Sequence, residues 1–102
     1  MTSNSERISD PSLLVLTSLA EGEKHGYAIM TDVEQFAEVR LGPGTLYGAI
    51  QRLENRGMIE AVNSDDRRQP YRLTRAGRRY LDEQLRQFHS LARLGLKRLE
   101  AQ

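Results

Sequence analysis

The sequence predicts a mainly α-helical α+β domain that carries one small β-hairpin. Three stretches with apolar residues at helical spacing are followed by two short β-prone runs around a polar turn, and a longer helical stretch comes last. With 102 residues, 38% of them apolar, the chain has the length of one compact domain with one modest core. A domain of this size has little room for a deep catalytic cavity, so we expect a small binding module.

The first three helices are expected at residues 11–21, 26–37 and 43–56. Asp10 is a capping residue, and Pro11 suits the first position of the first helix. A short connection at residues 24–26 leads to the second helix, and Gly57 suits a left-handed cap after the third. The apolar positions that mark the buried face of the third helix are Leu46, Ile50 and Leu53.

A β-hairpin follows, with strands expected at residues 58–62 and 71–73. The segment between them has the composition of an exposed turn. Pro70 lacks a backbone N–H, so we expect it at the start of a strand or on an edge and not in a central ladder. Three helices followed by such a hairpin describe a winged helix-turn-helix, in which the third helix enters the major groove of DNA and the wing lies against the backbone or the minor groove.

Thr74 can cap a long last helix at residues 75–101. A helix of this length is a rod of about 40 Å, whereas a domain of this length has a radius of gyration of about 13 Å. Much of its leucine-rich stripe must overhang the core, so we expect a dimer seam there; the alternative is a helix that folds back over its own core. The residues expected at the seam are Leu81, Leu85, Phe88, Ala92 and Leu99.

The near-neutral net charge of +1 hides a regional separation of charge. Residues 1–39 carry two basic against seven acidic side chains, and residues 40–80 carry nine arginines against four acidic side chains. Such a separation can mark a surface that faces a polyanion, although a solvated arginine-rich face is the plainer explanation.

The outward face of the third helix is small, polar and basic. It presents Gly44, Gly48, Gln51, Arg52 and Asn55, with Thr45 and Tyr47 at its margins. Glycine inside a helix costs about 1 kcal/mol relative to alanine, and one reason to keep it is close approach to base edges. The alternatives are a tight Gly-Pro-Gly turn at residues 42–44, a packing accommodation at Gly48, and a Tyr47 ring that packs inward.

The polar side chains of this face and of the wing suit DNA. The amides of Gln51 and Asn55 can read adenine, and Arg52 can bind guanine or a phosphate. The hydroxyls of Thr45 and Tyr47 suit phosphate oxygens. The wing arginines are expected to reach phosphate or a narrow minor groove, or else to form ion pairs in a solvated turn; they are Arg67, Arg68 and Arg72.

Two sequence blocks at a fixed separation resemble the PadR family of bacterial winged-helix transcriptional regulators. The first is Leu41-Gly42-Pro43-Gly44-Thr45-Leu46-Tyr47 and the second is Tyr71-Arg72-Leu73-Thr74-Arg75-Ala76-Gly77, with His25-Gly26-Tyr27 upstream. The resemblance implies a homodimeric repressor of the short subclass, with one C-terminal dimerisation helix. It also implies that Thr45, Tyr47, the exposed side of the third helix and the wing arginines face DNA.

We expect the chain to divide into a flexible N-terminus (1–10), a winged-helix DNA-binding domain (11–74) and a C-terminal dimerisation helix (75–102). The partners expected are double-stranded DNA with a pseudo-palindromic operator and a second copy of the chain. Two departures from the family pattern are Pro70 in the wing and the absence of tryptophan from the last helix. Drug sensing is therefore not implied.

Composition and motifs argue against an enzyme. There is no cysteine for a disulfide or a thiolate metal site, and two histidines are too few to replace them, so no cofactor or metal is expected. His25 can cap the second helix or meet a phosphate. No catalytic triad order or phosphate-cradling loop appears, and no signal peptide or membrane span is predicted, which favours the cytoplasm. The alternative function is a winged-helix module that binds proteins.

An effector, where one exists, is expected at the dimer seam. The residues expected there are Phe88, His89 and Ala92, where small side chains leave room for a flat aromatic molecule; close helix packing at those small residues is the alternative. A small rotation at the seam would change the distance between the two recognition helices and release DNA.

Overall fold

The computed structural model describes residues 10–65 and 67–102. Within this part of the chain lie four helices and one three-stranded sheet. The helices are α2 (Pro11–Leu19), α3 (Gly26–Ala37), α4 (Pro43–Asn55) and α5 (Arg75–Glu100), and the strands are β1 (Lys24–His25), β2 (Ile59–Ala61) and β3 (Pro70–Leu73). The predicted α+β class is confirmed. The segment predicted to be flexible, residues 1–10, lies outside the described residues except for Asp10, which caps α2 by accepting the Ser12 N–H at 2.9 Å.

The sheet is larger than the predicted hairpin. Strand β3 lies in the centre and pairs antiparallel with β2 on one side and β1 on the other, so that His25 stands opposite Pro70. The prediction that residues 24–26 are only a connection was wrong, because two residues are too few to show the period of a strand. Pro70 begins β3, as predicted, but in the central strand. Its carbonyl accepts the Val62 N–H at 2.9 Å.

The core lies between α2, α3 and α4 and is closed by residues from β2 and α5. Its apolar side chains are almost fully shielded from solvent, and burial of this surface is the main favourable term that holds the fold together. The buried apolar residues are Leu14, Val15, Leu16, Leu19, Ile29, Val33, Leu41, Leu46, Ala49, Ile50, Leu53, Ile59 and Leu81. Leu81 is thus used within its own chain, although the sequence interpretation placed it at the dimer seam.

The start of α5 is fixed against the loop that leads into β2. Thr74 caps the helix by accepting the Gly77 N–H at 3.0 Å, and the Thr74 N–H donates to the Met58 carbonyl at 3.0 Å. A Cβ at Gly77 would overlap that carbonyl oxygen and lie 2.8 Å from the Met58 carbonyl carbon. Glycine is therefore required here by close approach of two backbones.

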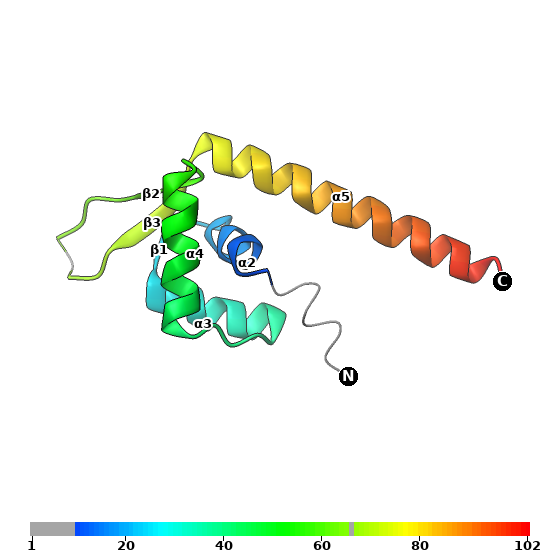
Figure 1. Ribbon diagram of the computed structural model, residues 1–102, viewed down its shortest axis with the longest axis horizontal. Helices are drawn as coiled ribbons and strands as arrows, with labels where there is room; N and C mark the ends of the chain where they lie inside the picture. The colour runs from blue at the N-terminus through cyan, green and yellow to red at the C-terminus, as the bar shows by residue number, and fades with distance from the viewer. Residues whose placement is uncertain (1–9, 66) are drawn as a thin grey trace.

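Most of α5 leaves the globular part of the molecule (Figure 1). Every residue from 85 to 102 is exposed, and the described chain measures 58 × 30 × 20 Å along its principal axes. The predicted overhang is confirmed, and the helix does not fold back over its own core. The large apolar side chains left open on α5 are Leu85, Phe88, Leu91, Leu94, Leu96 and Leu99.

Candidate nucleic-acid interface

Helix α4 has one buried and one exposed face, as the sequence predicts. Leu46, Ala49, Ile50 and Leu53 are buried. On the other side, Gly48 is half-buried, and the remaining predicted contact residues are exposed: Gly44, Thr45, Tyr47, Gln51, Arg52 and Asn55. The side chains that the sequence analysis assigned to base edges therefore share one solvent-facing surface.

The two glycines of α4 have open space in front of them. A Cβ at Gly44 would meet no other atom within 4 Å, and a Cβ at Gly48 would meet only the Arg52 Nη1 atom, at 3.6 Å. Packing within this chain therefore gives no reason for glycine at either position. What the glycines produce is a stretch of helix surface with no side chains, beside which an external surface can come close.

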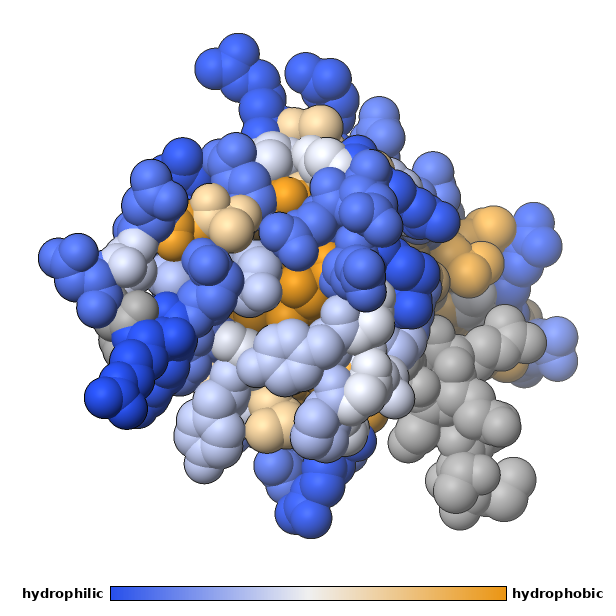
Figure 2. Space-filling model, turned by 60° about the vertical axis from the view of Figure 1, so that its left-hand side comes forward, coloured by the Kyte–Doolittle hydropathy of each residue, from blue (hydrophilic) through white to orange (hydrophobic). Residues whose placement is uncertain are grey.

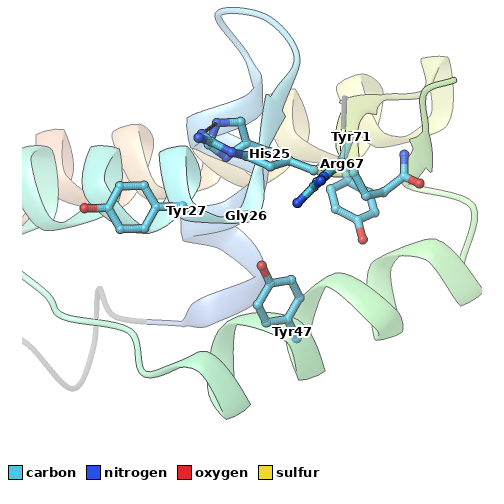
Figure 3. A pocket seen from close by; sticks show the side chains of 8 residues that line it. His25, Gly26, Tyr27, Tyr47, Arg67 and Tyr71 are labelled. Atoms are coloured by element: carbon cyan, nitrogen blue, oxygen red, sulfur yellow. Dashed lines mark hydrogen bonds between the residues drawn. The ribbon is translucent and has the colours of Figure 1, made fainter. Parts of the chain in front are cut away.

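The Tyr47 side chain points neither fully into the core nor fully into solvent, the two alternatives that the sequence left open. Its side chain is 50% exposed, and it rises from α4 with its hydroxyl directed toward Gly26 at the start of α3 (Figure 3). A Cβ at Gly26 would overlap the Tyr47 hydroxyl and lie 2.8 Å from its Cζ atom. Gly26, in the upstream His25-Gly26-Tyr27 motif, thus makes room for Tyr47, in the first of the two family blocks.

A cleft of about 250 Å³ opens where α3, α4 and the wing meet. Figure 3 shows Tyr47 below the cleft, His25 above it and Tyr71 reaching from β3 toward α4. Among the described residues, those that line it are His25, Gly26, Tyr27, Tyr47, Arg67, Arg68, Gln69 and Tyr71. Phenol, imidazole and guanidinium groups are donors that suit an oxyanion.

His25 has a different partner on each ring nitrogen. Its Nδ1 atom accepts the Ala28 N–H at 3.3 Å, which makes His25 the cap of α3, and its Nε2 atom lies 3.0 Å from the Arg68 Nη1 atom. The sequence analysis offered capping or phosphate contact as alternatives for His25. The pairing of β1 with β3, which brings His25 to the wing, is the feature that sequence patterning missed.

Tyr71 stands at the inner wall of the same cleft. Burial raises the pKa of Tyr71 above its usual 10.0, and the nearby Glu54 carboxylate and the Tyr47 phenol add to the rise. The Tyr71 hydroxyl therefore keeps its proton and remains a hydrogen-bond donor throughout the physiological pH range.

The wing carries exposed arginines at its outer end and an ion pair nearer its base. Arg67 and Arg68 are exposed, and Figure 2 shows a mostly hydrophilic surface on the face that includes the wing. Arg72, also predicted to contact DNA, pairs with Glu60 on the neighbouring strand at 2.8 Å. Of the predicted wing arginines, Arg67 and Arg68 reach the cleft and Arg72 does not line it.

A second, apolar hollow of about 290 Å³ lies between α2, α3 and α5. Its lining residues are Leu13, Leu14, Thr17, Phe36, Ala37, Leu85 and Phe88. Of the three residues proposed for an effector, Phe88 lines this hollow, whereas His89 and Ala92 do not. Leu85 and Phe88 share one helical stripe with exposed leucines further along α5, so the hollow borders the surface on which we expect a second copy.

Residues 10–65 and 67–102 contain neither a cluster of metal-ligating side chains nor a helix that could span a membrane. No group of three or more metal-ligating side chains gathers in this part of the chain. None of its helices combines the length and the apolar composition that crossing a bilayer demands.

Known proteins resemble the chain over most of its length. It is 47% identical over 88 residues to an uncharacterized 37.1 kDa protein in transposon TN4556 of Streptomyces fradiae. The aligned region covers 86% of this chain but only 25% of the length of that protein. It is 36% identical to the transcriptional regulator Rv3488 of Mycobacterium tuberculosis, over 79% of this chain and 78% of that one.

The fold is shared with a solved structure of similar size. A PadR family transcriptional regulator from Eggerthella lenta superposes with a TM-score of 0.76 at 31% identity, over 99% of this chain and 91% of that one. The sequence pattern of the transcriptional regulator PadR-like family matches residues 15–83, which include the winged helix and the start of α5. The chain belongs to the PadR-like family of transcriptional regulators, which are not enzymes.

Proposed function

We propose that this chain is a homodimeric repressor that binds a pseudo-palindromic DNA operator through α4 and the wing. The division of labour is a DNA-binding domain at residues 11–74 and a dimerisation helix at residues 75–102. Membership of the family implies DNA binding and dimerisation. A regulator of this kind acts on DNA in the bacterial cytoplasm.

The observation that carries the proposal is the exposed face of α4. Its side chains are polar or absent, the space before Gly44 and Gly48 is open, and the helix has no side-chain cap at its N-terminus. Unpaired amides at that end favour a phosphate, and the bare surface lets base edges approach Gln51 and Asn55. The alternative function is a protein-binding module. It does not account for an uncapped, polar helix face with two bare positions that lies next to the wing arginines Arg67 and Arg68.

The dimer is proposed to form through the overhanging part of α5. Leu91 and Leu99 are 68% and 71% exposed, and a row of such leucines on a free helix would associate in water. A two-fold dimer would place two copies of α4 in successive major grooves, about 34 Å apart on one side of the duplex. Operator symmetry follows from this arrangement.

An effector is proposed to act at the α5 surface, beside the apolar hollow that Phe88 lines. A flat apolar molecule seated between α2, α3 and α5 would change how the second copy packs there, and with it the distance between the two α4 helices. The effector and the operator must then weaken each other's binding by the same factor.

The test begins with duplexes enriched by the purified chain from fragments of its own genome. The expected result is an enriched sequence with two-fold symmetry, with binding that weakens by orders of magnitude as salt rises, because several phosphates release their counterions. A promoter that carries this sequence upstream of a reporter gene is expected to be silenced by the chain. Equal affinity for all duplexes, or binding to none at low salt, contradicts the proposal and favours the protein-binding alternative.

A further inference from the structure

The backbone at Gly26 gives no reason for a glycine. Gly26 is the first residue of α3, and its φ is not in the positive range, unlike those of Gly22 and Gly57. Any L-residue can adopt such a backbone, and alanine favours a helix over glycine. The reason for glycine at this position therefore lies in what surrounds it.

The nearest surroundings of Gly26 belong to one side chain, that of Tyr47. A Cβ at Gly26 would overlap the Tyr47 hydroxyl and would lie 2.8 Å from Cζ and 3.0 Å from Cε1, and these are its three nearest atoms. Figure 3 shows the ring rising from α4 with its hydroxyl directed at the start of α3. All three atoms are at the far end of a side chain, so an added methyl group would displace the ring and not a backbone.

A ring displaced from Gly26 can move only toward the exposed side of α4. The other side is closed, because Leu46, the preceding residue, is buried in the core. Side chains of a helix lean toward its N-terminus, and Gly44 lies one turn before Tyr47 with open space in front of it. The displaced ring would therefore reach the part of α4 that has no side chains of its own.

We propose that Gly26 is a positioning residue for DNA binding and that it acts through Tyr47. Because Gly26 has no side chain, the Tyr47 ring lies against the start of α3 and stays off the bare surface at Gly44 and Gly48. Gly26 itself is buried, so its effect on a duplex passes through the ring that covers it. The inference rests on the proposed function, in which base edges approach that bare surface.

The first experiment measures thermal unfolding of Gly26→Ala in three backgrounds. In the otherwise wild-type chain the methyl group meets the ring, and we expect Tm to fall. In the Tyr47→Ala chain no ring stands in the way, and Tm is expected to stay the same or rise. Phe36→Ala is the matched control background, because Phe36 is an aromatic residue on α3 with an exposure of 45%, close to the 50% of Tyr47. There we expect the same fall as in the wild-type chain.

The second experiment measures the affinity for a duplex that the wild-type chain enriches from a random-sequence pool, at a temperature where the variants are folded. Gly26→Ala is expected to weaken binding on the order of tenfold, the effect of one displaced interface side chain. In the Tyr47→Ala chain the same substitution is expected to cause no further loss. The slope of log K against log salt is expected to stay unchanged, because no charged contact to phosphate is lost. A disturbed fold that moved the wing arginines would flatten that slope.

Tyr47→Phe provides a graded test and keeps the inference testable if Gly26→Ala alone does not fold. It removes the hydroxyl but leaves Cζ at 2.8 Å from the added Cβ, so the cost of Gly26→Ala in this background is expected to be intermediate. The double variant Gly26→Ala/Tyr47→Ala is expected to fold and to bind as Tyr47→Ala does.

The outcomes separate this inference from the function on which it rests. Equal losses of affinity from Gly26→Ala with and without the Tyr47 ring overturn the inference and leave the proposed function standing. Unchanged affinity in Gly26→Ala has the same consequence, because the position of the ring would then not matter. A fall of Tm in the Tyr47→Ala background shows that another contact requires the glycine, and it also overturns the inference. A wild-type chain that enriches no duplex overturns the proposed function and the inference together.

Discussion

Gly48 offers a sharp test of the recognition face, because the stability of the fold and the affinity for DNA are expected to respond differently to a side chain at this position. The Cβ of Gly48→Ala would meet only the Arg52 Nη1 atom, at 3.6 Å, which is ordinary van der Waals contact. Replacing a glycine inside a helix by alanine stabilises it by about 0.5 to 1 kcal/mol. For a domain of this size, that gain corresponds to a rise in Tm of roughly 2 to 8 °C at a fixed protein concentration.

The same position is expected to be intolerant in DNA binding. In Gly48→Glu, the carboxylate lies one helical turn before Arg52 and can pair with it, so the fold is expected to remain as stable as the wild type. At the DNA surface, however, the side chain adds bulk and a negative charge that faces phosphates. A loss of affinity on the order of a hundredfold is expected, since like charges placed together at an interface cost several kcal/mol.

Thermal unfolding and fluorescence anisotropy with an enriched duplex measure the two effects separately. Gly48→Gln is the matched control, because it has nearly the bulk of Gly48→Glu without its charge, and its affinity is expected to fall between those of the alanine and glutamate variants. A lower Tm for Gly48→Ala would show that glycine is required by packing. Normal duplex binding by Gly48→Glu would show that α4 does not enter the groove.

Three further predictions concern the rest of the molecule. Gly77→Ala is expected to destabilise the chain by more than about 3 kcal/mol in chemical denaturation, because its Cβ would overlap a backbone carbonyl that cannot move aside; a loss below about 1 kcal/mol would contradict this reading. Leu91→Asp is expected to convert the dimer to monomer in light scattering without unfolding it, since Leu91 is 68% exposed, whereas Ser90→Asp on the polar side of α5 should remain dimeric. Tyr71 is expected to ionise above pH 10, since burial raises its pKa; an alkaline absorbance titration follows this ionisation, and Tyr71→Phe should remove it from the titration. The stability that the protonated phenol contributes is complete below pH 10 and is lost as pH rises through the folded-state pKa, and chemical denaturation at several alkaline pH values should show that Tyr71→Phe lacks this loss.

The features that could be predicted from sequence are those set by neighbours along the chain. The bounds of α3 were predicted correctly at 26–37, and those of α4 and α5 to within one residue, because apolar spacing, Pro43 and Thr74 act locally. The end of α2 was predicted two residues late, at 21 instead of Leu19. The exposed face of α4 followed from the same spacing, since burying Leu46, Ile50 and Leu53 leaves only one side for Gln51 and Asn55.

The features that sequence missed depend on contacts between distant segments. Strand β1 exists because β3 offers it a partner, and nothing in Lys24-His25 alone indicates a strand. The cleft follows from that pairing, because His25 reaches the wing only once it stands opposite Pro70. Leu81 shares the helical stripe of Leu85, and only the three-dimensional packing shows that the first is buried and the second 43% exposed.

The glycines of the motif blocks show why one residue type supports two different arguments. Gly26 and Gly77 are buried, and each gives way to another part of the chain, the Tyr47 ring and the Met58 carbonyl. Gly44 and Gly48 face open space and give way to nothing within the chain. A side chain at the first pair must therefore disturb the packing of the fold, whereas a side chain at the second pair meets open space and would meet only a partner outside the chain. Duplex DNA is the partner that we propose for this bare, polar helix surface, because its base edges can approach Gly44 and Gly48 closely.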